Sequence, residues 1–308
     1  MTNRRSFLRL AGGLTATSLL LPTLGCGNQP GDAGESVEAL DDDDVATDGA
    51  TTGSLSTFGI QLYTLRDMLP GDPKGTLKAV ADMGYRQIEG YEGDQGMFWG
   101  MTAQEWKDYC DELGLTMVSC HVNINENLAE KAQQLASIGV DYALCAYVGE
   151  QDGRAGWQAI VDKFNAAGKT CRDNGIGFAY HNHAYSFEEV DGFIPQDFLM
   201  ENSDDTVDYE MDIYWVVTGG ADPIEYLEKY PGKWKLCHVK DRKKGAPLED
   251  HEASVNLGEG SIDFARILAV AEAQGMEYYI LEQENYENST PLRSARAGAE
   301  YLGQLEFA

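Results

Sequence analysis

The chain has 308 residues, 43% of them hydrophobic, and a formal net charge of −28 at pH 7. A chain of this length and composition can bury the core of one large domain, so no second domain is required. Its strongly acidic balance repels phosphate backbones, which argues against nucleic acid as a partner.

Segment 1–26 is predicted to be an export signal. The sequence NRRSFLR, from Asn3, precedes an Ala-, Gly- and Leu-rich run ending at Leu21, and this arrangement resembles the twin-arginine signal. The run is too short to span a membrane. Cys26 follows Leu24 and Gly25 as in a lipoprotein box, which predicts a lipid anchor and a periplasmic or membrane-anchored location. A plain secreted enzyme with an incidental cysteine is the alternative.

Residues 27–57 consist mostly of small and acidic residues, including the run Asp41 to Asp44. Because they contain almost no large apolar side chain, they cannot bury a core and are predicted to form a disordered acidic tether. Beyond the tether, Cys120, Cys145 and Cys237 lie inside apolar runs. We expect them to be small core residues, since an odd number of cysteines at irregular spacing gives no disulfide framework.

From residue 58 onward, strand-like runs alternate with helical patterns. Strands are predicted at 58–65, 87–91, 115–122, 141–148, 176–183, 207–215, 234–241 and 278–285. Helices are predicted at 73–83, 102–113, 128–138, 157–174, 195–201, 223–229, 263–274 and 291–305. Five of these helices are followed at once by a glycine, a common way to end a helix.

Most of these strands begin about 30 residues apart, which is the size of a βα unit. Eight such units over about 250 residues predict a TIM barrel at 58–308, with active-site residues at the carboxyl ends of the strands. An open doubly wound sheet is the alternative, but no glycine-rich phosphate loop follows the first strand.

Ligand-type side chains follow the apolar residues of the last four predicted strands. They are His181, Asp212, His238 and Glu282. In a barrel they would converge at one rim, where two imidazoles and two carboxylates suit Mn²⁺, Zn²⁺, Co²⁺ or Fe²⁺ better than Ca²⁺. A single buried histidine is more often a hydrogen-bonded core residue, but four such side chains at successive strand ends are harder to explain in that way.

Six short motifs occur in order: GIQLYTLRD, AYHNH, DYEMDIYWV, CHVKDR, NLGEGSIDF and ILEQEN. With them the folded domain resembles the xylose-isomerase-like sugar phosphate isomerase/epimerase family. The resemblance implies a divalent metal, with Mn²⁺ favoured, on His181, Asp212, His238 and Glu282. The family's ketose epimerases have Glu at the position of His181, and there two glutamates both bind metal and exchange protons with the substrate.

The expected reaction is proton abstraction next to a sugar carbonyl, with the enediolate stabilised by the metal. Glu282 is the first choice for a base that is also a ligand. The second base stays open among Glu89, His121, His183 and Lys240. Lys240 shares a strand face with His238, so it can hold an oxyanion or a hydroxyl, oriented by Asp241. A rim salt bridge is the alternative for Lys240.

The predicted substrate contacts are Gln61, Tyr63, Asn123, His183 and Trp215. Tyr63 and Trp215 offer an apolar platform for a sugar face, although aromatic residues in strands more often belong to the core. The segment 256–263 is either a glycine-hinged loop over the rim or a turn that caps a helix through Ser261 or Asp263.

The leading hypothesis is therefore a metal-dependent isomerase or epimerase acting on a sugar or sugar derivative outside the cytoplasm. Alternatives are a lyase that eliminates the aglycone from a keto-glycoside, or a non-catalytic sugar-binding lipoprotein. An apurinic endonuclease on the same barrel is disfavoured by the acidic surface. The particular sugar and the oligomeric state stay open.

Overall fold

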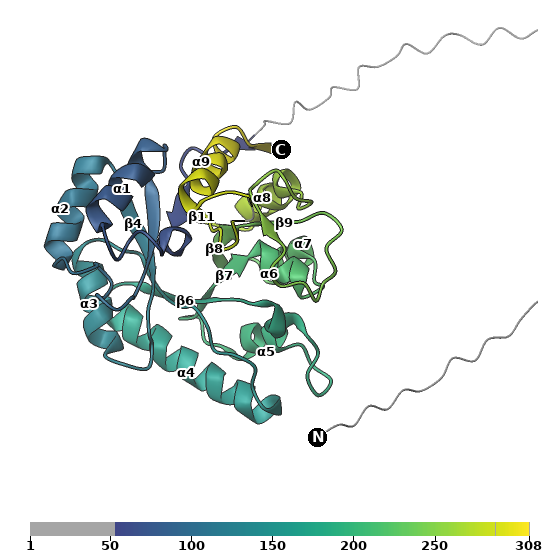
Figure 1. Ribbon diagram of the computed structural model, residues 1–308. Coiled ribbons are helices and arrows are strands. Elements are labelled where there is room, and N and C mark those ends of the chain that lie inside the picture. Colours follow the sequence, from purple (N-terminus) through teal and green to yellow (C-terminus); the bar gives the residue numbers. More distant parts are fainter. Residues whose placement is uncertain (1–52, 287, 308) are drawn as a thin grey trace, which may run out of the picture. The chain divides into compact units, whose positions relative to one another are not determined.

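The computed structural model describes residues 53–286 and 288–307, and within them eight parallel strands close into a barrel surrounded by helices (Figure 1). The strand order around the barrel is β11-β2-β3-β4-β5-β6-β7-β8. The bounds are β2 Gly59–Gln61, β3 Gln87–Tyr91, β4 Thr116–His121, β5 Tyr142–Cys145, β6 Gly177–His181, β7 Asp208–Asp212, β8 Trp234–Val239 and β11 Tyr278–Leu281. This is the TIM barrel that the alternation of strands and helices predicts.

The described residues form nine α-helices. They are α1 Pro73–Asp82, α2 Ala103–Leu113, α3 Leu128–Ser137, α4 Gly153–Asp173, α5 Pro195–Asn202, α6 Ile213–Thr218, α7 Pro223–Lys229, α8 Phe264–Ala273 and α9 Pro291–Leu302. Eight of them lie within a few residues of their predicted positions, while α6 begins where the sequence predicts a strand. At α2, Thr102 and Glu105 form a reciprocal capping box, and Gly114 ends the helix with a left-handed φ of 67°.

A small apolar layer fills the inside of the barrel beneath the rim. It includes Ala179 of β6, Leu236 of β8 and Ile280 of β11, all buried. Residues two positions apart in a strand face the same side. His181, His238 and Glu282 stand two residues after these three positions, so the same inward face that builds the apolar layer carries polar side chains at the rim.

Most predicted strands are longer than the observed ones, and two of them extend into the helix that follows. The predicted strand 58–65 ends at Gln61, whose side chain accepts the Tyr63 N–H at 2.9 Å and begins a 3-10 helix, η1 Leu62–Leu65. The predicted strand 207–215 ends at Asp212, and Trp215 lies in the first turn of α6. In both cases a polar side chain at the strand end satisfies a free N–H of the next turn, which an apolar strand pattern does not reveal.

The last residues of the predicted tether are ordered. β1 Gly53–Ser54 pairs antiparallel with β12 Glu306–Phe307, next to the C-terminus. Two more short elements complete the fold: the pair β9 Asp241–Arg242 with β10 Ser254–Val255, and the 3-10 helix η2 Ala184–Phe187. The predicted export signal, Cys26 and the tether up to residue 52 lie outside the described residues.

The cysteines of the described chain are all free and buried, as expected of small core residues. Cys120 and Cys237 are fully buried, and Cys145 is almost so. Among the residues that the structure covers, no helix has the length and apolar character needed to cross a membrane.

Candidate metal centre and pocket

The structure brings the four predicted metal ligands together at the carboxyl ends of β6, β7, β8 and β11. One potential ligand atom from each of these buried residues lies within 4.8 Å of all the others: His181, Asp212, His238 and Glu282. His238 Nδ1 lies 3.3 Å from Glu282 Oε2 and 3.7 Å from Asp212 Oδ2. The barrel has thus assembled two imidazoles and two carboxylates from four separate strand ends.

Two atoms of this cluster fit a bound cation in particular. Asp212 Oδ2 and His238 Nδ1 are buried, and neither has a hydrogen-bond partner in the described chain. Buried polar atoms are nearly always satisfied, so each such exception calls for an explanation. Asp212 Oδ1 accepts the Trp215 N–H at 2.9 Å, which fixes the carboxylate and leaves Oδ2 directed at the cluster. The mixed N/O donor set fits a divalent transition metal.

A second layer of buried carboxylates lies on the other side of the imidazoles. His238 Nε2 lies 2.7 Å from Glu89 Oε1, and His181 Nδ1 lies 3.0 Å from Glu210 Oε2. His121 Nε2 lies 3.0 Å from both Glu89 Oε1 and Glu210 Oε2. A carboxylate on the far nitrogen of an imidazole fixes its orientation and tautomer, as in many metal sites.

Glu89, a predicted candidate base, is therefore placed beneath the cluster and not in the pocket. Its side chain is fully buried and accepts hydrogen bonds from Gln61 Nε2 at 2.7 Å and Ser119 Oγ at 2.6 Å. Gln61, predicted to contact substrate, is buried in the same network. Glu89 contacts His238 and His121, and Gln61 holds Glu89 in place, so both side chains support the rim histidines.

Glu210 is a member of this layer that the sequence reasoning missed. It stands two residues before Asp212 on β7, and therefore on the same inward strand face. This two-residue spacing from Asp212 is the sequence feature that could have identified Glu210. His121, His181, Glu210 and His238 form a second group with metal-ligating geometry, which overlaps the first through two shared histidines.

The buried residues of this layer and the neighbouring histidines have pKa values shifted in different directions. Burial raises the pKa of Glu89, but the positive charges of His121 and His238 outweigh it and hold this pKa well below the usual range. Burial, together with the nearby charge of Glu89, raises the pKa of Glu210 to about 7. Burial and the neighbouring His238 lower the pKa of His181 well below its usual value. The lowered pKa favours the neutral imidazole of His181, which is the form that binds a metal. At His238 burial lowers the pKa, but Glu210, Glu282 and Glu89 outweigh burial and raise it well above the usual value.

Lys240 is a buried cation beside the four-residue cluster. Its Nζ lies 3.4 Å from Glu282 Oε2 and 3.8 Å from Asp212 Oδ2, and it also donates to Glu284 Oε2. The ammonium lies 4.9 Å from the centre of the Trp215 ring. Burial lowers the pKa of Lys240, but Asp212, Glu282 and Glu284 raise it by more, so the side chain stays charged.

Asp241 does not orient Lys240, contrary to the sequence-based expectation. Its carboxylate accepts backbone N–H groups from Gly258 at 3.0 Å, Gly260 at 2.9 Å and Ile262 at 3.2 Å. These hydrogen bonds hold the segment 256–263 against Asp241, just beyond the end of β8. Asp263 caps α8 by accepting the Arg266 N–H, so the capping turn is the correct interpretation of this segment.

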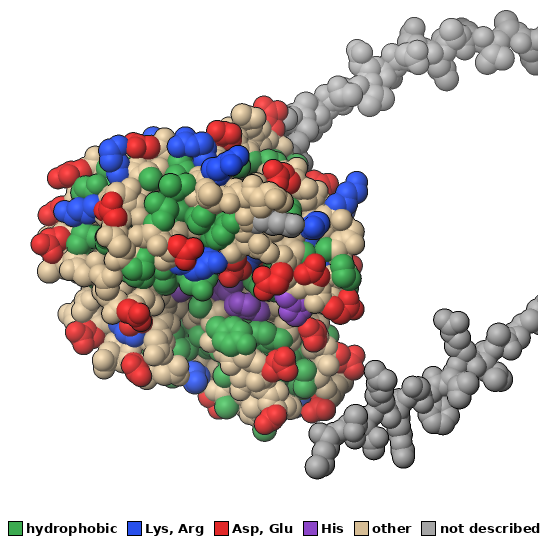
Figure 2. Space-filling view, viewed as in Figure 1, with side chains coloured by type: hydrophobic (Ala, Val, Ile, Leu, Met, Phe, Trp, Pro, Cys, Tyr) green, Lys and Arg blue, Asp and Glu red, His purple; other side chains and the backbone are tan. Residues whose placement is uncertain are grey.

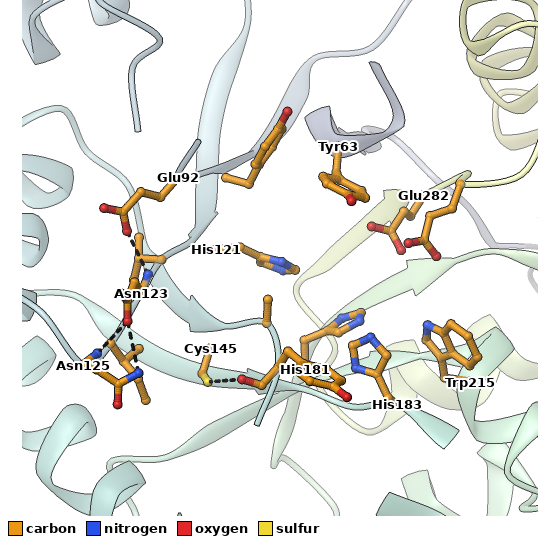
Figure 3. Close-up of a pocket in the computed structure, with 16 residues that line it drawn as sticks. Tyr63, Glu92, His121, Asn123, Asn125, Cys145, His181, His183, Trp215 and Glu282 are labelled. Carbon is orange, nitrogen blue, oxygen red and sulfur yellow. Dashed lines mark hydrogen bonds between the residues drawn. The ribbon is translucent and has the colours of Figure 1, made fainter. Parts of the chain in front are cut away.

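A pocket of about 460 Å³ opens above the cluster (Figure 3), and histidine side chains are visible within a hollow of the surface in Figure 2. The predicted residues that line it are Tyr63, His121, Asn123, His181, His183, Trp215 and Glu282. Lining residues that the sequence reasoning did not single out include Glu92, Asn125, Tyr147 and Glu284. A pocket of this size with aromatic walls and a few polar groups is typical of small-molecule sites.

Comparison with known proteins agrees with this fold. A model of the xylose isomerase-like TIM barrel family matches residues 77–305, and the chain belongs to this family. A sugar phosphate isomerase/epimerase from Parabacteroides distasonis is 26% identical, with a TM-score of 0.71 over 80% of this chain and 98% of that one. A zinc-bound IOLI protein shares the fold at 14% identity, with a TM-score of 0.66 over 80% of this chain and 98% of that one.

Curated relatives belong to an enzyme class that removes water. The inosose dehydratase of Clostridium perfringens is 26% identical over 165 residues, which cover 47% of this chain and 54% of that protein. That of Geobacillus kaustophilus is 26% identical over 164 residues, covering 48% and 53%. The chain thus spans about half the length of the curated relatives it matches. These relatives support membership of an enzyme family, but their names do not indicate an isomerase.

Proposed function

We propose that this protein is a metal-dependent enzyme that removes a proton from the carbon next to a carbonyl group in a sugar or cyclitol derivative. The observation that carries the proposal is the pair of orphaned buried atoms, Asp212 Oδ2 and His238 Nδ1, beside Glu282 at the floor of the pocket. His181, Asp212, His238 and Glu282 would hold the metal. A divalent cation there would polarise the substrate carbonyl and stabilise the negative charge that develops on its oxygen.

Glu282 is our candidate for the base. Burial raises its pKa, but His238 and Lys240 outweigh burial and lower the pKa well below the usual range, so the carboxylate is ionised. A low pKa by itself makes a weak base. The support for Glu282 is its position in the pocket beside the other candidate ligands. Lys240 provides a fixed positive charge beside it, from a buried position that is not part of the pocket lining. His121 lines the pocket from β4, but Glu89 and Glu210 outweigh burial and raise its pKa to about 10, so its imidazolium suits a proton donor better than a base.

We favour elimination as the next step. Once Glu282 has taken the proton, the electron pair forms a carbon–carbon double bond and expels the oxygen substituent on the adjacent carbon. That oxygen takes up a proton, for which Glu284, hydrogen-bonded to Lys240 and lining the pocket, is a candidate source. The names of the inosose dehydratases support this outcome, because a dehydratase eliminates water. His181, which cannot serve as a second glutamate base, supports it as well.

Isomerisation or epimerisation is the second candidate, and the Parabacteroides distasonis relative supports it. In that case the proton returns to the same or a neighbouring carbon, and no substituent leaves. The metal in either reaction is proposed to be Mn²⁺, with Zn²⁺, Co²⁺ and Fe²⁺ also compatible with the donor set. No Lys or Arg is found among the described residues that line the pocket, so an uncharged substrate fits it better than a phosphorylated one.

The test is hydrogen exchange in D₂O. The protein is loaded with Mn²⁺ and incubated with inososes, free sugars and keto-glycosides, and deuterium uptake and products are followed by NMR and mass spectrometry. We expect metal-dependent exchange with loss of water or aglycone, and Glu282→Gln should slow exchange about 10²- to 10⁴-fold, as loss of a general base does. Glu130→Gln, on the exposed surface of α3, is the control.

Each outcome separates the hypotheses. Exchange with a rearranged sugar and no leaving group would assign the isomerase. Sugar binding without exchange for any member of the panel would overturn the proposal in favour of a non-catalytic binding protein. Wild-type exchange in Glu282→Gln would move the proton transfer to another residue, with His121 the next to replace.

We further propose that the protein is exported by the twin-arginine route and anchored by a lipid on Cys26. The support is the sequence pattern of segment 1–26. Replacing Arg4 and Arg5 by lysine should trap the precursor inside the cell, and normal export of this variant would refute the route. Mass spectrometry of the mature N-terminus tests the lipid separately.

A further inference from the structure

Large exposed hydrophobic side chains concentrate at the pocket. In the part of the chain that the structure describes, three such residues are exposed: Tyr63 at 39%, Tyr147 at 63% and Leu248 at 48%. Both tyrosines line the pocket, whereas Leu248 does not. Exposed aromatic residues at the mouth of a site, an amphipathic surface that suits ligand contact, call for an explanation beyond the core.

The two tyrosine rings are held in place although they are exposed. The Tyr63 ring packs edge-on against Tyr91, with centroids 5.2 Å apart, and the Arg66 guanidinium lies 4.7 Å from its centre. The Tyr147 ring packs edge-on against His183 at 5.2 Å and Tyr185 at 5.5 Å. A ligand that stacks on such preorganised rings loses less free energy to ordering them.

The loop that carries Tyr147 is anchored as well. The Tyr185 hydroxyl accepts the backbone N–H groups of Val148 at 3.3 Å and Gly149 at 3.2 Å. Tyr185 in turn bonds to the hydroxyl of Tyr180, the residue before His181 in β6, at 3.1 Å. The position of Tyr147 is therefore tied to the strand that supplies His181, one of the candidate metal ligands.

The pocket is of a size that suits a ligand larger than one sugar ring. Its volume of about 460 Å³ lies within the range of about 300–1,000 Å³ of pockets that bury drug-sized ligands. The candidate metal ligands come from β6, β7, β8 and β11, on one side of the barrel mouth. Asn123, Asn125 and Glu92 lie on the opposite side of the pocket in Figure 3.

The chemistry of that opposite side suits a neutral ring with a polar edge. The charge of Glu92 is compensated by Lys131 Nζ at 2.8 Å, and its carboxylate also accepts the Asn123 N–H at 2.8 Å. The side-chain amide of Asn125 donates to Asn123 Oδ1 at 3.1 Å. Amides hydrogen-bond to hydroxyl or ether groups without favouring either sign of charge.

We infer that the side of the pocket opposite the candidate metal ligands is a subsite for a second ring of the substrate. This second ring stacks on Tyr147 and Tyr63, while the first ring lies over the candidate metal ligands. This inference rests on the proposed function and narrows it: the substrate class is a neutral two-ring glycoside rather than a single cyclitol. The shared chemistry of the second ring is an apolar face with a hydrogen-bonding edge, which either a second sugar or an aromatic aglycone supplies.

The experiment measures binding, which does not depend on turnover. The Mn²⁺-loaded protein is titrated with methyl β-glucoside, cellobiose and phenyl β-glucoside, followed by calorimetry or saturation-transfer NMR. We expect at least one two-ring ligand to bind about 10-fold more tightly than methyl β-glucoside, since one stacked ring contributes on the order of a tenfold gain. Preference for cellobiose assigns a second sugar, and preference for phenyl β-glucoside assigns an aromatic aglycone.

Variants then locate the preference. Tyr147→Ala and Tyr63→Ala should reduce the ratio of two-ring to one-ring affinity toward one, whereas Tyr147→Phe, which keeps the ring, should retain it. Leu248→Ala is the matched control for loss of an exposed apolar side chain and should keep the wild-type ratio. Circular dichroism verifies that each variant is folded.

The inference is overturned if the wild-type ratio is one, if no ligand binds, or if Tyr147→Ala and Tyr63→Ala both keep the wild-type preference. Its failure is distinct from failure of the proposed function. If deuterium exchange occurs but two-ring and one-ring ligands bind equally well, the proposed function stands and the subsite is refuted. If two-ring ligands bind tenfold more tightly but no exchange occurs, the subsite stands and the proposed catalytic function is refuted.

Discussion

The Nε2 atom of His238 lies 2.7 Å from Oε1 of Glu89, and both side chains are completely buried. This contact turns the other ring nitrogen, Nδ1, toward Asp212 and Glu282, at 3.7 and 3.3 Å. A carboxylate that fixes the far nitrogen of a ligand histidine orients the ring and increases its basicity. Glu89 thus acts on the candidate metal centre through His238, and its position under the rim gives it no access to the pocket.

Glu89→Gln should weaken metal binding about 10- to 100-fold, because it removes the charge that orients His238. Titration of the metal-free variant with Mn²⁺ or Zn²⁺ measures the change, and deuterium exchange should recover largely at saturating metal. Glu92→Gln is the matched control, since this carboxylate follows the same strand but pairs with Lys131 at the pocket wall. Equal metal affinity in the Glu89 and Glu92 variants would contradict a positioning role.

Asp212→Asn should abolish bound metal while preserving the fold. Asparagine retains an oxygen that can cap α6 by accepting the Trp215 N–H, as Asp212 Oδ1 does at 2.9 Å, but its amide replaces the carboxylate that would bind a cation. His238→Ala should have the same effect, because rim residues of this fold serve function more than stability. Metal content by mass spectrometry checks both variants, and full occupancy in His238→Ala would refute the cluster.

Lys240→Met should destabilise the metal-free protein by about 3–5 kcal/mol, because it leaves the buried carboxylates of Asp212 and Glu282 without their cation. Bound metal supplies positive charge at the same place, so the loss should be smaller in the loaded protein. Urea unfolding with and without Mn²⁺ measures the difference. Lys235→Met, which breaks the surface pair with Glu277, should cost less than about 1 kcal/mol in both states. An equal loss with and without metal for Lys240→Met would separate this lysine from the metal centre.

Asp208, at the start of β7, predicts a pH dependence of stability away from the site. Burial raises its pKa to about 6, against the partial compensation of Lys235 and Lys233. A carboxyl group whose pKa is higher in the folded than in the unfolded state binds more protons when folded between about pH 4 and 6. The free energy of unfolding therefore falls as the pH rises through this window, and the penalty is complete above pH 6.

Asp208→Asn should raise the free energy of unfolding at pH 7.5 by about 1 kcal/mol, after allowance for the partial exposure of the side chain, and by much less at pH 4. Denaturant unfolding at the two pH values measures both terms. Asp204→Asn, an exposed aspartate in the same connection, should change neither. A gain of equal size at pH 4 and pH 7.5 would mean that the charge of Asp208 is not the cause.

The sequence determined the barrel and the candidate metal ligands because both depend on local periodicity. Strands and helices alternate at the spacing of βα units, and helices carry their own caps, such as the Thr102 box of α2. His181, His238 and Glu282 follow apolar residues at a spacing of two, and a closed parallel barrel requires such strand ends to meet at one rim. Those steps need no knowledge of which side chains touch.

Only the tertiary structure decided what each polar side chain does, because that depends on partners far away in the chain. Glu89 and Gln61 are of residue types that occur in active sites. Glu89 nevertheless contacts Ser119 and His238 beneath the rim, and Gln61 donates to Glu89 there. Asp241 is adjacent to Lys240 in sequence but binds backbone amides up to 21 residues further on. The exposure of Tyr147 likewise depends on whether the neighbouring loops cover it, and periodicity carries no information about covering.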